Sequence, residues 1–188
     1  GKLMTQGIVS DVIEQYLRED IPSIDTLATM KQYLSNLSPD QTIRWCSVTL
    51  QQNNTSLEQT VVNGSSLEVT IEYEVLERTS GLRVFFDLQD NEETLLLRSF
   101  HDENTDGIPI MESGFYSSTA VIPADILAPV HYTLIVRAGI HNVRYCHPVD
   151  GIHIPLTVEH TGRYNKAYLG DTHRGKFAIP LEWKTTKK

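Results

Sequence analysis

The sequence predicts an all-β protein, an antiparallel β-sandwich of the immunoglobulin-like or jelly-roll type with a short N-terminal helix. Apolar and polar residues alternate along several segments after about Gln41, and turn-forming residues separate these segments. Alternation with a period of two is typical of strands that have one buried and one solvated face. No helical stripe of ten or more residues interrupts them, apart from a weak one at 25–34. A parallel sheet, which needs crossover helices, is therefore disfavoured.

The first 20 residues predict the helix. Gly7 can adopt the positive φ of a turn, and Ser10 is a suitable N-cap. The apolar stripe of this helix consists of Val12, Ile13, Tyr16 and Leu17. An isolated helix of this length is marginal in water, so we expect it to dock on something outside this chain. We interpret the chain as a piece of a larger protein, with residues 21–40 as a linker and 41–188 as the sandwich.

About eight strands are predicted in the sandwich. Five of them follow from alternation, and their expected inward-facing residues are Leu67, Val69, Ile71, Tyr73 and Val75; Leu82, Val84, Phe86 and Leu88; Tyr132, Leu134, Val136 and Ala138; Ile152, Ile154, Leu156 and Val158; and Phe177, Ile179, Leu181 and Trp183. Further strands are expected at 43–50, 94–100 and 116–122. Because Pro155 lacks an amide hydrogen, its strand is expected at an edge or with a bulge there.

Composition and charge narrow the function. At 188 residues the chain has room for one domain and an appendage. A formal net charge of -8 argues against a nucleic-acid partner, which requires clustered Lys and Arg. The two cysteines, Cys46 and Cys146, could bridge two sheets in a secreted sandwich; two reduced thiols are the favoured interpretation.

No motif for catalysis or metal binding is present. The sequence contains no Walker A motif, no G-x-S-x-G elbow and no H-E-x-x-H. The group of Cys146, His147, His141 and His153 lacks the short paired spacing of zinc sites, so no metal and no cofactor is expected. The acidic segment 101–107 is interpreted as a solvated loop; a glycosidase carboxylate pair and a Ca²⁺ site are the less favoured alternatives.

One segment suggests a sugar platform. On the strand that begins near Leu82, the residues Arg83, Phe85 and Asp87 alternate with the inward-facing ones and are expected on the solvated face. Aromatic rings pack on the apolar face of sugars, and arginine binds carboxylates or phosphates bidentately. Arg98 and Arg137 would share this face if their strands are neighbours. The alternative is that Phe85 packs under a loop or a dimer partner while Arg83 and Asp87 pair on the surface.

Two sets of motifs resemble a known family. The run Gly1-Lys2-Leu3, then Gly7, Val12-Ile13 and Tyr16 is similar to the last strand, turn and helix of an ABC-transporter ATPase domain. The segments that resemble the C-terminal domain of polysaccharide-exporting ABC ATPases of the Wzt type are Glu112-Ser113-Gly114-Phe115-Tyr116, Ile122-Pro123, Ile126-Leu127, Tyr132-Thr133-Leu134, Arg174-Gly175, and Pro180, Leu181 and Trp183. The glycine that the family carries just before the tyrosine is replaced in Pro129-Val130-His131-Tyr132, so this turn departs from the family pattern.

The resemblance implies a function and an assembly. It implies a non-catalytic domain that recognises the capped non-reducing end of a lipid-linked O-polysaccharide for export. The candidate carbohydrate-binding residues are those of the sugar platform above: Arg83, Phe85, Asp87, Arg98 and Arg137. It also implies a homodimer in which the last strand can be exchanged, and contact with a transporter membrane subunit through the missing ATPase domain. The expected location is cytoplasmic, at the inner face of the membrane.

Two other functions stay open. A structural dimerisation or interaction module without a glycan site is the main alternative. An enzyme that acts on glycans has less support, because no buried acid pair is identifiable in the sequence.

Overall fold

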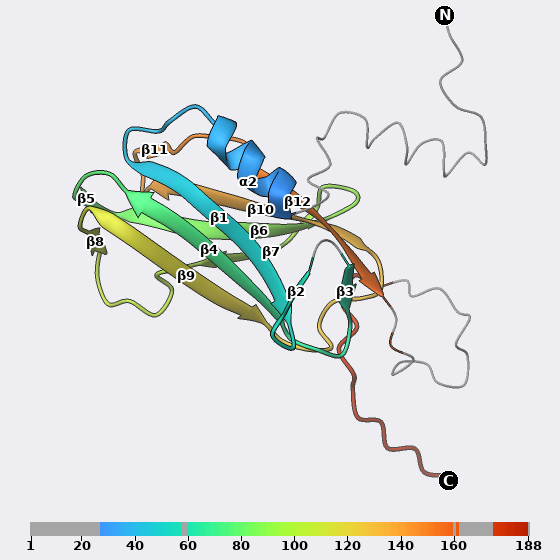
Figure 1. The fold of residues 1–188 in the computed structure, drawn as a ribbon. Coiled ribbons are helices and arrows are strands. Elements are labelled where there is room, and N and C mark those ends of the chain that lie inside the picture. The colour runs from blue at the N-terminus through green and yellow to red at the C-terminus, as the bar shows by residue number, and fades with distance from the viewer. Residues whose placement is uncertain (1–26, 58–59, 160, 162–174, 188) are drawn as a thin grey trace, which may run out of the picture.

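The computed structural model describes residues 27–57, 60–159, 161 and 175–187. The helix predicted in residues 1–20 lies outside the described residues. The described part contains the helix α2 (Leu27–Asn36) and twelve strands, which form two packed sheets and a small ribbon (Figure 1). The predicted all-β sandwich is confirmed.

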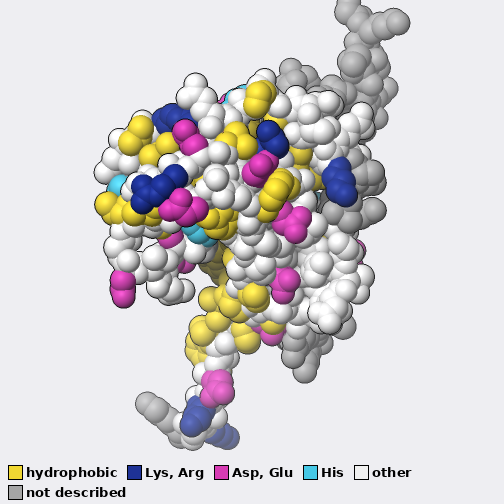
Figure 2. Space-filling model, turned by 60° about the vertical axis from the view of Figure 1, so that its left-hand side comes forward, with side chains coloured by type: hydrophobic (Ala, Val, Ile, Leu, Met, Phe, Trp, Pro, Cys, Tyr) yellow, Lys and Arg dark blue, Asp and Glu magenta, His cyan; other side chains and the backbone are white. Residues whose placement is uncertain are grey.

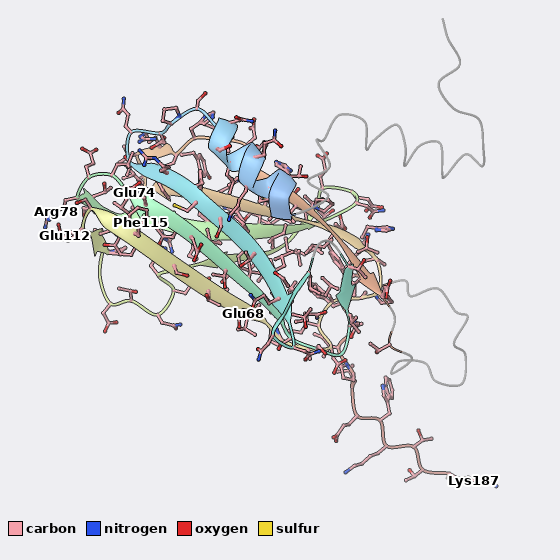
Figure 3. The ribbon with its side chains drawn as sticks, in the orientation of Figure 1. Glu68, Glu74, Arg78, Glu112, Phe115 and Lys187 are labelled. Carbon is pink, nitrogen blue, oxygen red and sulfur yellow. The ribbon has the colours of Figure 1, made fainter. Side chains whose placement is uncertain are left out.

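Sheet A has four antiparallel strands. Their order is β2 (Thr55–Leu57), β1 (Ile43–Gln52), β4 (Leu67–Val75) and β9 (Gly114–Ile122). Glu74 of β4 lies opposite Phe115 of β9, and both are labelled on this sheet in Figure 3.

Sheet B has six strands. The order is β3 (Thr60–Val62), β12 (Ile152–Glu159), β10 (His131–Ile140), β6 (Leu82–Asp90) and β7 (Leu95–Phe100), and β11 (Arg144–Tyr145) also pairs with β10. A separate ribbon joins β5 (Thr79–Ser80) to β8 (Ile110–Met111). All pairs are antiparallel except that of β3 with β12. Since β3 pairs only with residues 157–159, no described strand lies beside Pro155 on this edge of β12, which agrees with the edge position that its missing amide hydrogen predicts.

The core lies between the two sheets. The residues predicted to face inward on β4, β6, β10 and β12 are all buried, and most are less than 5% exposed. Together with Ile43, Trp45, Val48 and Leu50 of β1 they form one hydrophobic cluster. Burial of apolar surface on this scale supplies most of the driving force for folding.

The segment predicted as a linker contains α2. Met30 and Leu34, four residues apart on one helical face, are buried in the core, and the helix contacts β1 (Figure 1). The weak stripe at 25–34 was the signal for this helix. Residues 27–36 are therefore packed on the sandwich.

The strand predicted at 177–183 is wrong for the single chain. Only an isolated bridge between Phe177 and Leu127 is present there, and Ile179, Leu181 and Trp183 are 57%, 71% and 85% exposed. We call residues 176–187 the C-terminal arm. Figure 2 shows the arm leaving the body with hydrophobic side chains along it. Apolar and polar residues do alternate along the arm, but a strand also needs a neighbouring strand for its backbone hydrogen bonds. The described residues provide such a neighbour only at the base of the arm.

Candidate functional site

A groove lies on the outer face of sheet B, the face turned away from the core. Its volume is about 490 Å³. It is lined by residues of β6, β7, β10, β11 and the turn between the last two: Arg83, Phe85, Arg98, Phe100, Gly139, Ile140, His141, Asn142, Val143, Arg144 and Tyr145. The groove thus combines aromatic rings with arginine guanidinium groups.

Three aromatic rings form the apolar part of the groove. Phe85 of β6 lies opposite Phe100 of β7, and their ring centroids are 4.9 Å apart. The Tyr145 ring, whose centroid is 6.4 Å from that of Phe85, is half exposed. Phe85 itself is only 4% exposed. Of the two interpretations of Phe85, the exposed platform is wrong and the packed ring is correct, because Phe100 and Tyr145 cover it.

Arg83 is held between an aromatic ring and a carboxylate. Its guanidinium carbon lies 3.6 Å from the centroid of Phe100, a cation–π geometry. Its Nε donates to both carboxylate oxygens of Asp102 at 2.9 Å. Burial would raise the pKa of Asp102, but the hydrogen bond and positive charge of Arg83 lower it overall. Asp102 is thus a fixed partner of Arg83, not a solvated loop residue as predicted.

His101 fixes the end of the loop beside Arg83. Its Nδ1 lies 3.0 Å from the Val84 amide nitrogen and 3.2 Å from the Val84 carbonyl oxygen, and the tautomer of the ring decides which of the two it bonds. Burial of the imidazole lowers the pKa of His101. The imidazole thus ties this end of the loop to Val84 of β6.

Asp87 lies beneath the groove and joins three strands. It is 1% exposed, which corrects the expectation that it projects into solvent. Arg98 of β7 donates to it from Nε at 2.6 Å and Nη2 at 2.7 Å, and Arg137 of β10 donates from Nη1 at 2.8 Å. The hydrogen bonds that Arg98 donates to Asp87 raise the pKa of Arg98 above its ordinary value.

The loop that contains Asp150 and Gly151 passes close to β10 and holds Arg137 in place. Its Nε and Nη2 donate to the Asp150 carbonyl at 3.3 and 3.2 Å. Gly151 has a φ of +87°, and a Cβ there would lie 2.6 Å from Ile135 and 2.7 Å from Arg137. Only glycine allows the loop to pass this close to β10.

The five residues predicted for the site are therefore close together, in two roles. Arg83, Phe85 and Arg98 line the groove, whereas Asp87 and Arg137 lie outside its lining and form the charged support. Sequence reasoning missed Phe100, Arg144 and Tyr145. Phe100 could have been found from its position two residues after Arg98, but no periodic pattern marks the two-residue strand β11.

The two cysteines form no disulfide with each other. Cys46 and Cys146 are both free thiols, and burial raises the pKa of Cys146 to about 11. Among the described residues, no three His, Cys, Asp or Glu side chains are grouped so that they could hold a metal ion. In the same part of the chain, no helix has the length and apolar character needed to span a membrane.

The fold and groove define a class of β-sandwich with a polar and aromatic depression on one sheet. Among solved structures, the fold is similar to that of the C-terminal domain of wzt, with a TM-score of 0.59, 10% identity, and coverage of 89% of this chain and 98% of that chain. Two structures of a β-glucosidase from Listeria innocua, in complex with glucose and with isofagomine, match with TM-scores of 0.34 and 0.35 and 13% and 12% identity; each match covers 59% of this chain and 16% of that chain. No protein-family model and no curated protein sequence matches the chain.

Proposed function

We propose that this chain is a non-catalytic carbohydrate-binding domain that recognises a glycan during polysaccharide export. The observation that carries the proposal is the groove on sheet B, where aromatic rings lie beside arginines of fixed orientation. The similarity of its fold to the C-terminal domain of wzt is compatible with this function. The ordered sequence motifs, from the ATPase-like N-terminal edge to Trp183, point to the same class.

The groove has the parts that sugar binding requires. The half-exposed ring of Tyr145 offers an apolar surface for the C–H side of a sugar ring. Arg83, Asn142 and His141 surround it with groups that bond to hydroxyls. These groups project from strand ends and a tight turn, so little conformational entropy is lost on binding.

The charges in the groove favour a polar ligand of low net charge. Arg83 is paired with Asp102, and Arg98 shares Asp87 with Arg137. The guanidinium groups keep free N–H donors, but their charges are largely balanced. A neutral sugar, or one with a single anionic substituent, fits this balance better than a polyanion.

Titration calorimetry tests the glycan site. The ligand is the oligosaccharide released by mild acid from the surface polysaccharide of the source organism, with and without its terminal cap. We expect Tyr145→Ala and Arg83→Ala to weaken binding at least about tenfold, because each removes a direct contact worth about 1.5 kcal/mol or more. Phe115→Ala is the matched control, since this aromatic residue is 78% exposed on sheet A (Figure 3).

The outcomes separate the candidate functions. Unchanged affinity in both groove variants would place the site elsewhere on the molecule. Absence of binding by the unaltered chain would favour a structural interaction module. Release of reducing ends during long incubation would revive the glycan-active enzyme.

We also propose a homodimer in which the C-terminal arm of one copy pairs with β9 of the other. Within the described residues, β9 pairs only with β4, and its inward-facing Tyr116, Ser118 and Ala120 are only half buried. A further strand would cover them. The base of the arm is anchored: the carbonyl of Lys176 accepts from the Tyr132 hydroxyl at 2.6 Å, and its Nζ lies 3.2 Å from Asp90.

The remaining proposals concern the whole protein. Residues 1–20 are proposed as the trailing edge of an ABC ATPase domain, through which the protein would meet a transporter membrane subunit at the cytoplasmic face. The ATPase-like motif in this segment supports that assignment. Copurification of the full-length protein with the membrane subunit, and its loss when the ATPase domain is removed, would test it.

A further inference from the structure

Residues 139–147, from the end of β10 through β11, form one side of the groove, and we call them the groove wall. Asp40, which does not line the groove, forms a bidentate ion pair with Arg144 of this wall. Its Oδ2 accepts from Nη1 of Arg144 at 2.8 Å, and its Oδ1 accepts from Nη2 at 3.0 Å. The amides of His147 and Thr42 donate to the same carboxylate at 2.9 and 2.8 Å. Four hydrogen bonds satisfy a carboxylate side chain that is 6% exposed. Such forked arginine pairs fix orientation as well as distance.

The position of the groove wall depends on the ion pair of Asp40 with Arg144, because the strand β11 within the wall is short. The strand β11 is held to β10 by only two residue pairs, Gly139 with Tyr145 and Ile140 with Arg144. A second tie comes from β1, where Nε1 of Trp45 donates to the His147 carbonyl at 2.9 Å. Both ties run from residues 40–45 to residues 144–147, the segment that carries Tyr145, the exposed ring of the groove.

Asp40 is also close to α2 along the chain, on its N-terminal side. The helix ends at Asn36, and residues 37–42 connect it to β1. In Figure 1 the loop that follows α2 runs beside β11. The helix is held to the core by Met30 and Leu34. The segment 37–42 is thus a short bridge between the packed helix and the groove wall.

We propose that Asp40 is a positioning residue that holds Arg144 and Tyr145 in place and couples the groove to α2. The inference rests on the groove as the glycan site. A glycan that orders the wall would then also stabilise the packing of α2, from which the chain continues toward residues 1–26. Because coupling is reciprocal, loosening α2 must loosen the wall by the same free energy.

Hydrogen exchange on the full chain, without ligand, tests the coupling. Asp40→Asn replaces an oxygen that accepts hydrogen bonds by an NH₂ group, which would face an N–H donor. We therefore expect protection against exchange to fall roughly tenfold in residues 139–147, and to fall in residues 27–36 as well. Arg144→Lys, which keeps the charge but loses the fork, is expected to act in the same direction. Glu74→Gln, at an exposed ion pair on sheet A, is the control and should change neither segment.

A double-variant comparison locates the coupling. Met30→Ala, which loosens α2, should raise exchange in 139–147 when Asp40 is present and add nothing in the Asp40→Asn background. An equal effect of Met30→Ala in both backgrounds would overturn the proposal, because the coupling would then run through Trp45. Unchanged exchange in 139–147 on Asp40→Asn would also overturn it.

Calorimetry with the oligosaccharide probe keeps the two proposals apart. Asp40→Asn should weaken binding about tenfold, if the exchange data show a loosened wall. If the unaltered chain binds no oligosaccharide, the glycan function fails, while the exchange data still decide whether Asp40 couples the wall to α2.

Discussion

Asp87 and Arg98 form a bidentate ion pair beneath the groove, with N–O distances of 2.6 and 2.7 Å. The pair joins the central strand β6 to the edge strand β7, and Arg137 adds a third hydrogen bond from β10. Asp87 is almost completely buried. A buried carboxylate is tolerated only when charged donors satisfy it, so the three side chains act as one unit that orients the groove.

Asp87→Asn should destabilise the fold by about 2–3 kcal/mol, because it leaves two guanidinium groups without a full charge partner. Urea unfolding at pH 7 measures the loss. The matched control is Glu74→Gln, whose partner Arg44 is 62% exposed, and a loss below about 1 kcal/mol is expected there. Equal losses in the two variants would show that Asp87 contributes no more than a surface pair.

Gly151→Ala should destabilise the protein by more than about 3 kcal/mol, since it adds a clash to an unfavourable φ. Gly107→Ala separates the two effects. Gly107 has a similar φ of +80°, but a Cβ there would meet nothing within 4 Å. Gly107→Ala should therefore lower the free energy of unfolding only by the backbone strain, about 1–2 kcal/mol. Similar free energies of unfolding for both variants would rule out the close approach to Ile135 and Arg137 as the cause.

The periodic segments made most of the fold predictable. Alternation on β4, β6, β10 and β12 correctly assigned the predicted inward-facing residues to the buried face. The helix α2 was detectable only as a weak stripe, because two buried residues, Met30 and Leu34, hold it in place. The C-terminal arm shows the limit: its apolar and polar residues alternate as in a strand, but among the described residues only the bridge of Phe177 with Leu127 gives it a neighbour.

The site was less predictable because its parts meet across strands. Alternation placed Phe85 and Asp87 on the outer face, yet both are buried there. Their covers, Tyr145 for Phe85 and Arg137 for Asp87, come from residues 60 and 50 positions later in the chain. Strand order and register determine which side chains contact each other across strands, and the order and register are not readable from one sequence.

The pair of Asp102 with Arg83 should make stability depend on acid pH. Because the pKa of Asp102 is lower in the folded protein than in the unfolded chain, the ionised carboxylate stabilises the fold at neutral pH. This contribution is lost as the pH falls below about 4, the ordinary carboxyl range, and through the folded pKa. Asp102→Asn should therefore be less stable than the unaltered chain at pH 7, and the difference should shrink toward pH 2.5. Urea unfolding across this range measures it, and a difference independent of pH would contradict the assignment.

The exposed apolar side of the C-terminal arm should be buried in a dimer. Leu181 and Trp183 are 71% and 85% exposed in the single chain. Burial of each side chain stabilises an interface by about 1.5–3 kcal/mol, so Leu181→Ser combined with Trp183→Ser should weaken dimerisation at least about 100-fold.

Sedimentation velocity at micromolar concentration measures this weakening. Lys187→Ser, at the far end of the same arm (Figure 3), is the control and should remain dimeric. Replacing Phe115 on the solvated face of β9 should also leave the dimer intact, because an added strand would bury the other face of β9. A monomeric unaltered chain at high micromolar concentration would refute the dimer. A double variant that still dimerises would show that these two arm residues do not form the interface.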